Sequence, residues 1–176
     1  MNDQPIQIVD YDPSWPQNFT EQASELAVLL KPWLASAVEH VGSTAVPGMP
    51  AKPVVDILAP VHSLTHAREA VPALERAGWT WRPHGPRRDY RLLFLRPTPQ
   101  YRTHHLYLAP HDDPHSAGFL AFRDALRTRP ELRTRYASLK RQLAAVHRDD
   151  RHAYSLAKGD FVTRAVHEFM GPPDRP

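Results

Sequence analysis

A run of twenty residues, EHVGSTAVPGMPAKPVVDIL at 39–58, brings together residue types that bind phosphate. Gly42 followed by Ser43 allows the backbone to approach a ligand closely and leaves N–H groups that can bind an anion. The hydroxyl groups of Ser43 and Thr44 could add hydrogen bonds, and Lys52 could place its ammonium charge on a phosphate. These residues predict a phosphate site in the loop.

One carboxylate follows this loop inside an apolar run. Asp56 interrupts the stretch 53–61, which predicts a buried strand, and an unpaired buried carboxylate is costly. A metal ion, a basic partner or a position at the strand end would remove that cost. With the loop and its lysine, the carboxylate is typical of a nucleoside triphosphate site that holds a divalent metal. The alternative is a structural connector rich in Pro and Gly, in which Asp56 is a satisfied strand-end residue.

Periodicity and turn residues predict the elements that hold this loop. Helices are expected where apolar residues recur every three or four positions, and strands where short apolar runs lie between turn residues. The expected strands are 6–9, 37–41, 53–61, 79–81, 90–96 and 103–108. The expected helices are 19–34, 63–77, a helical series from Gly118 with a capping box at 128–131, and 150–169 with an interruption at Gly159.

The order of these elements predicts the fold class. Strands mixed with helices, followed by helices alone, indicate an α+β or mixed α/β fold, with a mixed sheet flanked by helices and a helical C-terminal part. The 176 residues suit a single domain over 1–170. It would consist of a sheet-containing core at 1–117 and C-terminal helices at 118–170, followed by a tail at 171–176.

The composition argues against several classes of protein. The chain has no cysteine, so a disulfide framework or thiolate metal site is excluded. No apolar run reaches the roughly 18 residues of a membrane span, and residues 1–10 lack the features of a signal peptide, so a cytoplasmic location without a membrane partner is expected. The net charge of +3 gives no strong nucleic-acid signal. Residues 118–176 hold twelve Lys and Arg against seven Asp and Glu, which suggests a basic face near an anionic ligand or a solvated helical surface.

The motif at 39–58 resembles the signature of the GrpB family, which belongs to the polymerase-beta-like nucleotidyltransferase superfamily. Four further stretches resemble parts of the same family, and the resemblance runs from Ile8 to Phe169. They are VDYDPSWPQNF at 9–19, RTHHLYL at 102–108, FRDALRTRPELRTRYASLKRQLA at 122–144 and DDRHAYSLAKGDFV at 149–162.

The resemblance implies a nucleotidyltransferase-like fold and a metal-dependent transfer of a nucleotidyl group from a nucleoside triphosphate to an unknown acceptor. In the superfamily pattern, a Gly-Ser turn precedes a strand that carries two acids one residue apart. Here Gly42-Ser43 is followed by twelve residues and then Asp56, which fits. The second acid is replaced by Leu58. The resemblance therefore implies phosphate binding by the turn and Mn²⁺ or Mg²⁺ binding by Asp56.

Histidines are the expected helpers of Asp56. His104 and His105 are adjacent on a predicted strand and point to opposite faces, so one of them could join Asp56 as a catalytic group and metal ligand, with His105 preferred. Imidazole favours Mn²⁺ or other transition metals over Mg²⁺. The family often has His-x-His here, whereas this chain has Tyr107 at the second position. His40 could bind phosphate or orient the loop, and Asp89 is a further candidate to compensate for the missing acid.

Basic residues complete the predicted nucleotide site. They are Arg91 on a strand and Arg123, Lys140 and Lys158 on C-terminal helices. A tyrosine stands four residues before each of these lysines, so each Tyr–Lys pair shares a helix face. Such a pair could present a stacking ring beside a cation to a nucleotide base. It could equally be a tyrosine packed under a lysine stem.

Two other functions fit the same residues. The first is a non-catalytic module that binds a nucleotide or another phosphorylated metabolite, left after loss of the second acid. Fusion of some family members to dephospho-coenzyme A kinase would link such a module to coenzyme A metabolism. The second is a phosphoryl or hydrolytic reaction that uses histidine and a transition metal.

Overall fold

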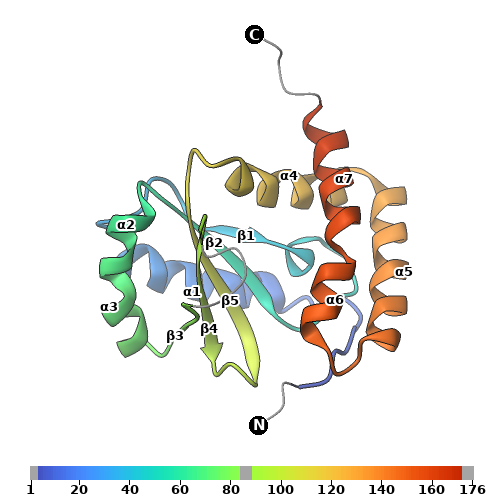
Figure 1. The fold of residues 1–176 in the computed structure, drawn as a ribbon, viewed down its shortest axis with the longest axis horizontal. Coiled ribbons are helices and arrows are strands. Elements are labelled where there is room, and N and C mark those ends of the chain that lie inside the picture. The colour runs from blue at the N-terminus through green and yellow to red at the C-terminus, as the bar shows by residue number, and fades with distance from the viewer. Residues whose placement is uncertain (1–3, 84–88, 172–176) are drawn as a thin grey trace.

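A five-stranded mixed sheet forms the centre of the computed structural model, which describes residues 4–83 and 89–171 (Figure 1). The strand order is β1-β2-β5-β4-β3, in which β2 and β5 are parallel and the other neighbours are antiparallel. This arrangement confirms the predicted mixed α/β class. The strands are β1 (Glu39–Val41), β2 (Val55–Val61), β3 (Thr80–Trp81), β4 (Leu92–Pro97) and β5 (Arg102–Pro110).

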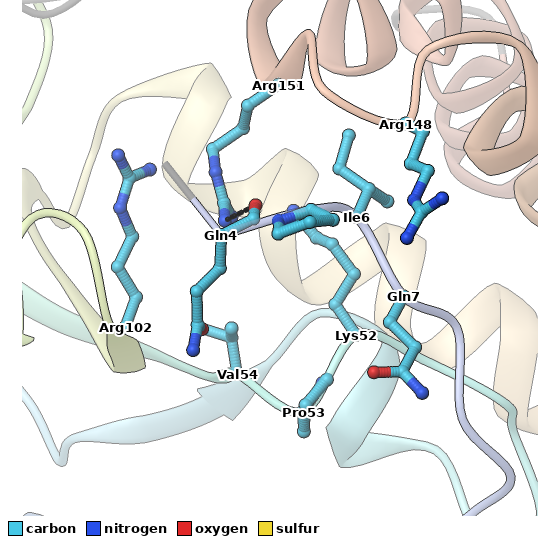
Figure 2. Close-up of a pocket in the computed structure, with 10 residues that line it drawn as sticks. Gln4, Ile6, Gln7, Lys52, Pro53, Val54, Arg102, Arg148 and Arg151 are labelled. Atoms are coloured by element: carbon cyan, nitrogen blue, oxygen red, sulfur yellow. Dashed lines mark hydrogen bonds between the residues drawn. The ribbon is translucent and has the colours of Figure 1, made fainter. Parts of the chain in front are cut away.

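The N-terminal segment lies against the loop between β1 and β2 and the stretch around Arg148 rather than in the sheet (Figure 2). The predicted strand at 6–9 is wrong, since only Val9 makes a bridge, with Ala51. The N–H of Ile6 donates instead to the carbonyl of Arg148 at 2.7 Å. A short apolar run can satisfy its backbone with isolated contacts, which periodicity does not reveal.

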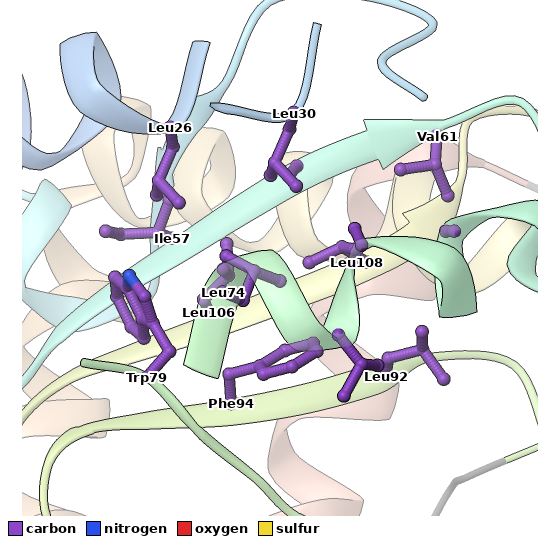
Figure 3. Close-up of a cluster of buried hydrophobic side chains, with 14 of the residues drawn as sticks. Leu26, Leu30, Ile57, Val61, Leu74, Trp79, Leu92, Phe94, Leu106 and Leu108 are labelled. Carbon is purple, nitrogen blue, oxygen red and sulfur yellow. The ribbon is translucent and has the colours of Figure 1, made fainter. Parts of the chain in front are cut away.

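One face of the sheet packs against the helices α1 (Trp15–Leu29), α2 (Leu64–Ala67) and α3 (Val71–Arg76), with a 3₁₀ turn η2 (Arg68–Ala70) between the last two. Alternate residues of the strands point to this face, because side chains in a strand alternate between faces. Leu26, Ile57, Leu74 and Phe94 are central members of the core that results (Figure 3). This core fixes the position of the sheet, and other elements pack on the opposite face of the sheet.

The opposite face carries α4 (Pro114–Thr128), which packs on the sheet through Phe119 and Leu120. The remaining helices are α5 (Pro130–Val146), α6 (Arg151–Ala157) and α7 (Gly159–Met170), and Figure 1 shows them gathered beside the sheet. Their apolar side chains pack with Val46 and Met49, which belong to the loop between β1 and β2. The predicted helical C-terminal part is therefore present and contacts the predicted phosphate loop.

Prolines explain where several helices begin and end. The first helix ends at Leu29 instead of residue 34, because Pro32 cannot supply the N–H that a continuing helix requires. The helical series starts at Pro114 rather than Gly118, since Asp113 caps it by accepting the N–H of His115 at 2.8 Å. None of the helices in the described ranges combines the length and apolar character that crossing a bilayer requires.

Two predictions about the C-terminal helices had different outcomes. The capping box at 128–131 is wrong, because Thr128 ends α4 and donates its hydroxyl to the carbonyl of Asp124 at 2.7 Å. Pro130 nonetheless opens α5, as expected of proline in a first turn. The interruption of the last helix near Gly159 is confirmed, with Asp150 capping α6 through the N–H of Ala153.

Candidate functional site

The Gly42-Ser43 turn lies directly over Asp56. Strands β1 and β2 are antiparallel, with Val41 opposite Asp56, so the chain leaving β1 passes the carboxylate. Gly42 has φ 72°, and a Cβ built there would lie 2.5 Å from Oδ2 of Asp56. Both the left-handed backbone and the close approach require glycine at this position. The twelve-residue spacing in the sequence thus returns the chain from the turn to the strand beside it.

Asp56 forms a hydrogen-bonded cluster with two residues of β5. The parallel register pairs Asp56 with His105, and Nδ1 of His105 donates to Oδ1 of Asp56 at 2.9 Å. The hydroxyl of Tyr107 donates to the same oxygen at 3.0 Å. The side chain of Asp56 remains 27% exposed, which leaves it reachable from the adjoining cavity.

The cluster contains one negative charge. Burial raises the pKa of Asp56, but the hydrogen bond from His105 and the positive charge of Lys52 outweigh burial, so the pKa lies below its ordinary value. Burial lowers the pKa of His105 more than the neighbouring carboxylate raises it. The pair is therefore an ionised carboxylate and a neutral imidazole whose proton is on Nδ1.

Tyr107 is the member of this cluster that the sequence interpretation missed. It stands two residues after His105, so the two side chains share a face of β5. This is the position where the family often has a second histidine. The strand period was enough to place the phenol beside Asp56, although a hydroxyl at that position carries no metal-binding signal of its own.

No second carboxylate accompanies Asp56 on the strand. Leu58 lies on the same face, is completely buried, and packs with Val41, Tyr107 and Ala109. It is part of the core under α4 and is not a gap beside the site. Asp89, the other candidate to compensate for the missing acid, does not line the cavity next to Asp56.

A cavity of about 470 Å³ opens between this cluster, the loop between β1 and β2 and the C-terminal helices. Gly42, Ser43, Thr44, Asp56 and His105 line it. Among the described residues of its lining, Asp56 is the single acid, and seven residues are basic. The seven are Lys52, Arg82, Arg91, Arg102, Lys140, Arg151 and Lys158. The cavity is therefore strongly positive and suited to an anion.

Lys140 ties the C-terminal helices to the loop between β1 and β2. Its ammonium group donates to Oγ of Ser43 at 3.0 Å and to the carbonyl of Pro50, although the side chain is almost completely buried. Burial and the positive charges of Lys158 and Lys52 lower the pKa of Lys140 to about 7. This lysine is consequently near half-protonation at neutral pH, and a bound anion would favour its charged form.

Lys52 and Lys158 both lie over the ring of Tyr154. The ammonium groups of Lys52 and Lys158 lie 5.2 Å and 4.4 Å from the ring centre of Tyr154. Burial lowers the pKa of Lys52 to about 7, with further lowering from Lys158 and Arg151. Tyr154 belongs to the cavity lining and is completely buried, so its ring lies beneath the two ammonium groups.

Arg91 reaches the cavity from the residues just before β4. Its guanidinium carbon lies 4.5 Å from the ring centre of Tyr107 and 5.5 Å from that of Phe119. Its Nε is buried and has no hydrogen-bond partner within the described parts of the chain. A ligand oxygen in the cavity would satisfy a guanidinium held in this way.

Two predicted binding residues lie away from the cavity. His40 lies on the face of α1, stacks on Phe19 with ring centres 4.7 Å apart, and bonds through Nε2 to Oγ1 of Thr44 at 3.0 Å. Burial lowers the pKa of His40 to about 4, so its imidazole is neutral. Its hydrogen bond to Thr44 orients the loop from the α1 side of the sheet. Arg123 donates to Glu39 at 2.7 Å and to the carbonyl of His40 at 3.1 Å, which ties α4 to β1.

The residues do not fit a divalent ion held by protein groups alone. The described residues contain no cluster of three or more His, Asp or Glu placed to hold a metal. Oδ1 of Asp56 already accepts two hydrogen bonds, and Nδ1 of His105 makes one of them. In this arrangement Asp56 and His105 are hydrogen-bonded to each other. Oxygen atoms of a bound ligand would have to supply most of the coordination.

The fold and the site define a mixed α/β protein with a basic, ligand-sized cavity on one face of its sheet. Residues 5–168 match the GrpB protein family, and the chain belongs to that family. A UPF0157 protein of Pseudomonas aeruginosa is 36% identical over 94% of this chain and 68% of its own length. A UPF0157 protein of Bacillus subtilis is 31% identical over 91% of this chain and 46% of its own length, so that relative is about twice as long as the match.

The chain is also similar to solved structures and to part of a longer enzyme. The crystal structure of GrpB from Enterococcus faecalis matches with a TM-score of 0.80 and 31% identity, over 94% of this chain and 100% of that chain. A dephospho-CoA kinase of Mycolicibacterium paratuberculosis is 43% identical over 43% of this chain and 19% of its own length. The Cid1 poly(U) polymerase matches with a TM-score of 0.44 and 14% identity, a likeness too distant to bear on activity.

Proposed function

We propose that this chain binds a nucleoside triphosphate in the central cavity. The observation that carries the proposal is the charge balance of the lining, in which seven basic residues and one carboxylate surround a Gly-Ser turn. A polyphosphate neutralises such a cluster, because each phosphate group accepts charge-assisted hydrogen bonds from lysine and arginine. The volume of about 470 Å³ lies in the range of roughly 300–1,000 Å³ typical of small-molecule sites.

The contacts suggest how the ligand would lie. Ser43, Lys140 and Lys52 would hold phosphate groups at the turn, since Lys140 already bonds Ser43. Arg91 would contact phosphate or sugar oxygens from the opposite wall. The ring of Phe119 also lines the cavity and offers a face for a base. Asp56, held by His105 and Tyr107, would stay ionised between the cations and orient them.

Transfer of the nucleotidyl group to an acceptor is the second candidate function. The rigidly held cluster of Asp56 beside the turn supports it, because phosphoryl-type transfer depends on positioning and on electrostatic stabilisation of phosphate charge. Mn²⁺ or Mg²⁺ would enter with the triphosphate, with Asp56 as one ligand. The buried Leu58 at the expected position of a second acid weighs against a two-metal arrangement. Binding without turnover is therefore the form that the geometry favours.

A phosphorylated metabolite near coenzyme A metabolism is the alternative ligand. The partial match to a dephospho-CoA kinase supports it, because part of this chain resembles a segment of that protein. A nucleotide moiety is common to adenosine triphosphate and dephospho-coenzyme A, so the same cavity would accept either. Because some relatives are longer than this chain, the acceptor and the macromolecular partners of the whole protein are proposals as well.

A ligand panel tests the proposal. Nucleoside triphosphates and dephospho-coenzyme A, with and without Mn²⁺ or Mg²⁺, should raise the melting temperature, since a ligand at 100 times its Kd adds about 2.7 kcal/mol. Arg91→Gln should reduce the shift, whereas Arg123→Gln, outside the cavity, should retain it. Release of pyrophosphate on addition of an acceptor would favour transfer. The absence of any shift at millimolar ligand concentration would overturn the proposal.

A further inference from the structure

A second basic cavity of about 530 Å³ lies beside the central one (Figure 2). The N-terminal segment 4–7 and the loop 52–54 form two of its walls, and the connection between α5 and α6 forms a third. Four basic side chains line it, and its described lining contains no acid. They are Lys52, Arg102, Arg148 and Arg151.

The walls of this second cavity are fixed by specific contacts. Ile6 is buried, and its N–H donates to the carbonyl of Arg148 at 2.7 Å. A guanidinium N–H of Arg151 donates to the carbonyl of Gln4 at 3.3 Å, and Figure 2 shows this side chain reaching from the α6 side towards the segment. The side chain of Gln7 completes the rim. The N-terminal segment is thus a structural wall and not a loose end over the surface.

The charges of this cavity act on one another. The positive charges of Arg151 and Arg102 contribute to the lowered pKa of Lys52, after burial and the charge of Lys158, while Asp56 raises it. A multivalent oxyanion such as a phosphate group would accept hydrogen bonds from the arginines in a forked geometry and would favour the charged form of Lys52.

The two cavities share a wall. Lys52, Arg102 and Arg151 line both, whereas Arg148 lines only the second cavity and Arg91 only the central one. Two anionic ligands would therefore lie on opposite sides of the shared cations. The second cavity is also large enough for a small molecule in its own right. A single elongated ligand that occupied both cavities would have to pass the shared side chains. Variants of Arg148 and Arg91, each of which lines one cavity only, can distinguish two separate ligands from one spanning ligand.

We propose that the second cavity binds a phosphate-bearing small molecule at the same time as the central cavity holds its own ligand. A small molecule is favoured over a nucleic acid because the N-terminal segment bounds the site, and because the net charge of +3 gives little general attraction for a polyanionic chain. The site does not rest on the proposed function, since Arg148 and the wall formed by residues 4–7 belong to the second cavity alone.

Amide shifts in ¹H–¹⁵N spectra test the proposal, with inorganic phosphate as the probe. The amides of Gln4, Ile6 and Gln7 report the second cavity, and those of Gly42 and Ser43 report the central one. Both sets should shift. In Arg148→Gln, the apparent Kd at the N-terminal amides should rise about fivefold, the effect of losing one charge-assisted contact, while the Kd at the turn stays within about twofold.

The matched variant Arg91→Gln should show the reverse, with a rise at Gly42 and Ser43 and none at the N-terminal segment. Preserved dispersion of the spectra shows that each variant is folded. Equal weakening of both sets by either variant would mean one shared site and would overturn the proposal, as would a turn that shifts alone.

Phosphate binding at the N-terminal amides without triphosphate binding in the central cavity would support the second site and refute the proposed function. Short single-stranded RNA provides the last arm of the experiment. If RNA displaced phosphate from the N-terminal amides at a lower concentration than phosphate itself needs to bind, the small-molecule assignment would fail.

Discussion

Gly42 and Asp56 constrain each other tightly in the candidate site. The turn can approach the carboxylate only without a Cβ, and Gly42 also has a positive φ. Gly48 has the same φ of 72°, but a Cβ there would meet nothing within 4 Å. The two glycines of one loop thus separate the cost of the backbone conformation from the cost of contact with the carboxylate.

This pair gives the first prediction. Gly48→Ala should lower the free energy of unfolding by about 1–2 kcal/mol, the ordinary cost of a left-handed alanine. Gly42→Ala should lose about 1–3 kcal/mol more, because the displaced carboxylate gives up hydrogen bonds to His105 and Tyr107. Urea unfolding measures both losses. Equal losses for the two variants would show that the approach of the turn to Asp56 is not tight.

The buried lysines give the second prediction, which concerns pH. Lys52 and Lys140 have pKa values lowered to about 7, and a bound triphosphate favours their charged forms. Binding is thus accompanied by proton uptake above pH 7, and affinity must fall as pH rises. Between pH 7 and pH 8.5 the Kd should rise about tenfold for each lysine that takes up a proton.

Calorimetric titration of a triphosphate at several pH values measures this slope. Lys140→Met retains the apolar stem of the side chain and should flatten the dependence, whereas the exposed Lys31→Met should leave it unchanged. A slope that is the same in Lys140→Met and in the wild type would place the titrating group elsewhere.

Residue types predicted much of the site but not the face on which each residue lies. Gly42, Ser43, Lys52 and Asp56 converge because strand pairing and the loop spacing are readable in the sequence. His40 also belongs to the motif, yet it alternates to the opposite face of β1 and stacks on Phe19. The residue type of His40 correctly indicated that it lies near the turn. The direction of its side chain depends on the register of the three-residue strand β1, which the sequence does not reveal.

At the scale of elements, α4 shows how a basic residue of the family pattern can be structural. Arg123 lies on this helix with its side chain only 12% exposed, and it joins Glu39 and the carbonyl of His40 on β1. A motif match cannot separate this role from phosphate binding, since both need a long cationic side chain. The contacts across two elements far apart in the sequence decide it.

The third prediction follows from this role. Arg123→Met should lower the free energy of unfolding by about 1–3 kcal/mol, because it leaves a part-buried carboxylate and a carbonyl without their donor. The Kd for a triphosphate should stay within about twofold. Arg91→Met should do the opposite, with a stability loss below about 1 kcal/mol and much weaker binding. Denaturant titration measures the stability of both variants, and calorimetry measures their Kd for a triphosphate. If Arg123→Met weakened binding and Arg91→Met lowered stability, Arg123 would be the binding residue and Arg91 the structural one.

Element boundaries were predictable where one residue dominates and were missed where tertiary contacts decide. The break near Gly159 and the start of α5 at Pro130 follow from backbone chemistry alone. Thr128 was expected to begin a helix and instead ends α4, because its hydroxyl can bond a carbonyl of the preceding turn as well as a following N–H. Local sequence does not choose between these two hydrogen bonds.

At the scale of the whole molecule, the charge is concentrated rather than spread. The net charge is +3, yet the central cavity alone gathers seven basic residues against one acid. Three of the seven, Lys140, Arg151 and Lys158, come from the C-terminal helices, whose basic excess was visible in the sequence. That excess could not reveal a cavity, because the opposing wall of β4 and β5 is brought there only by the sheet order.

The same concentration of charge gives the last prediction, which concerns metal ions. Without a nucleotide, Mn²⁺ should bind with a Kd no tighter than about 1 mM, since one carboxylate surrounded by cations attracts a divalent ion weakly. With a triphosphate, Mn²⁺ should bind together with the phosphate oxygens, and Asp56→Asn should weaken that joint binding only several-fold. Calorimetry with Mn²⁺ alone, with the triphosphate alone and with both separates these contributions. His105→Gln is the matched variant, because it removes the imidazole, one of the two partners of Oδ1, and leaves the carboxylate in place. Micromolar binding of Mn²⁺ alone, abolished in both variants, would show instead that Asp56 and His105 rearrange into joint ligands, and that the hydrogen-bonded pair is the metal-free state of a metal site.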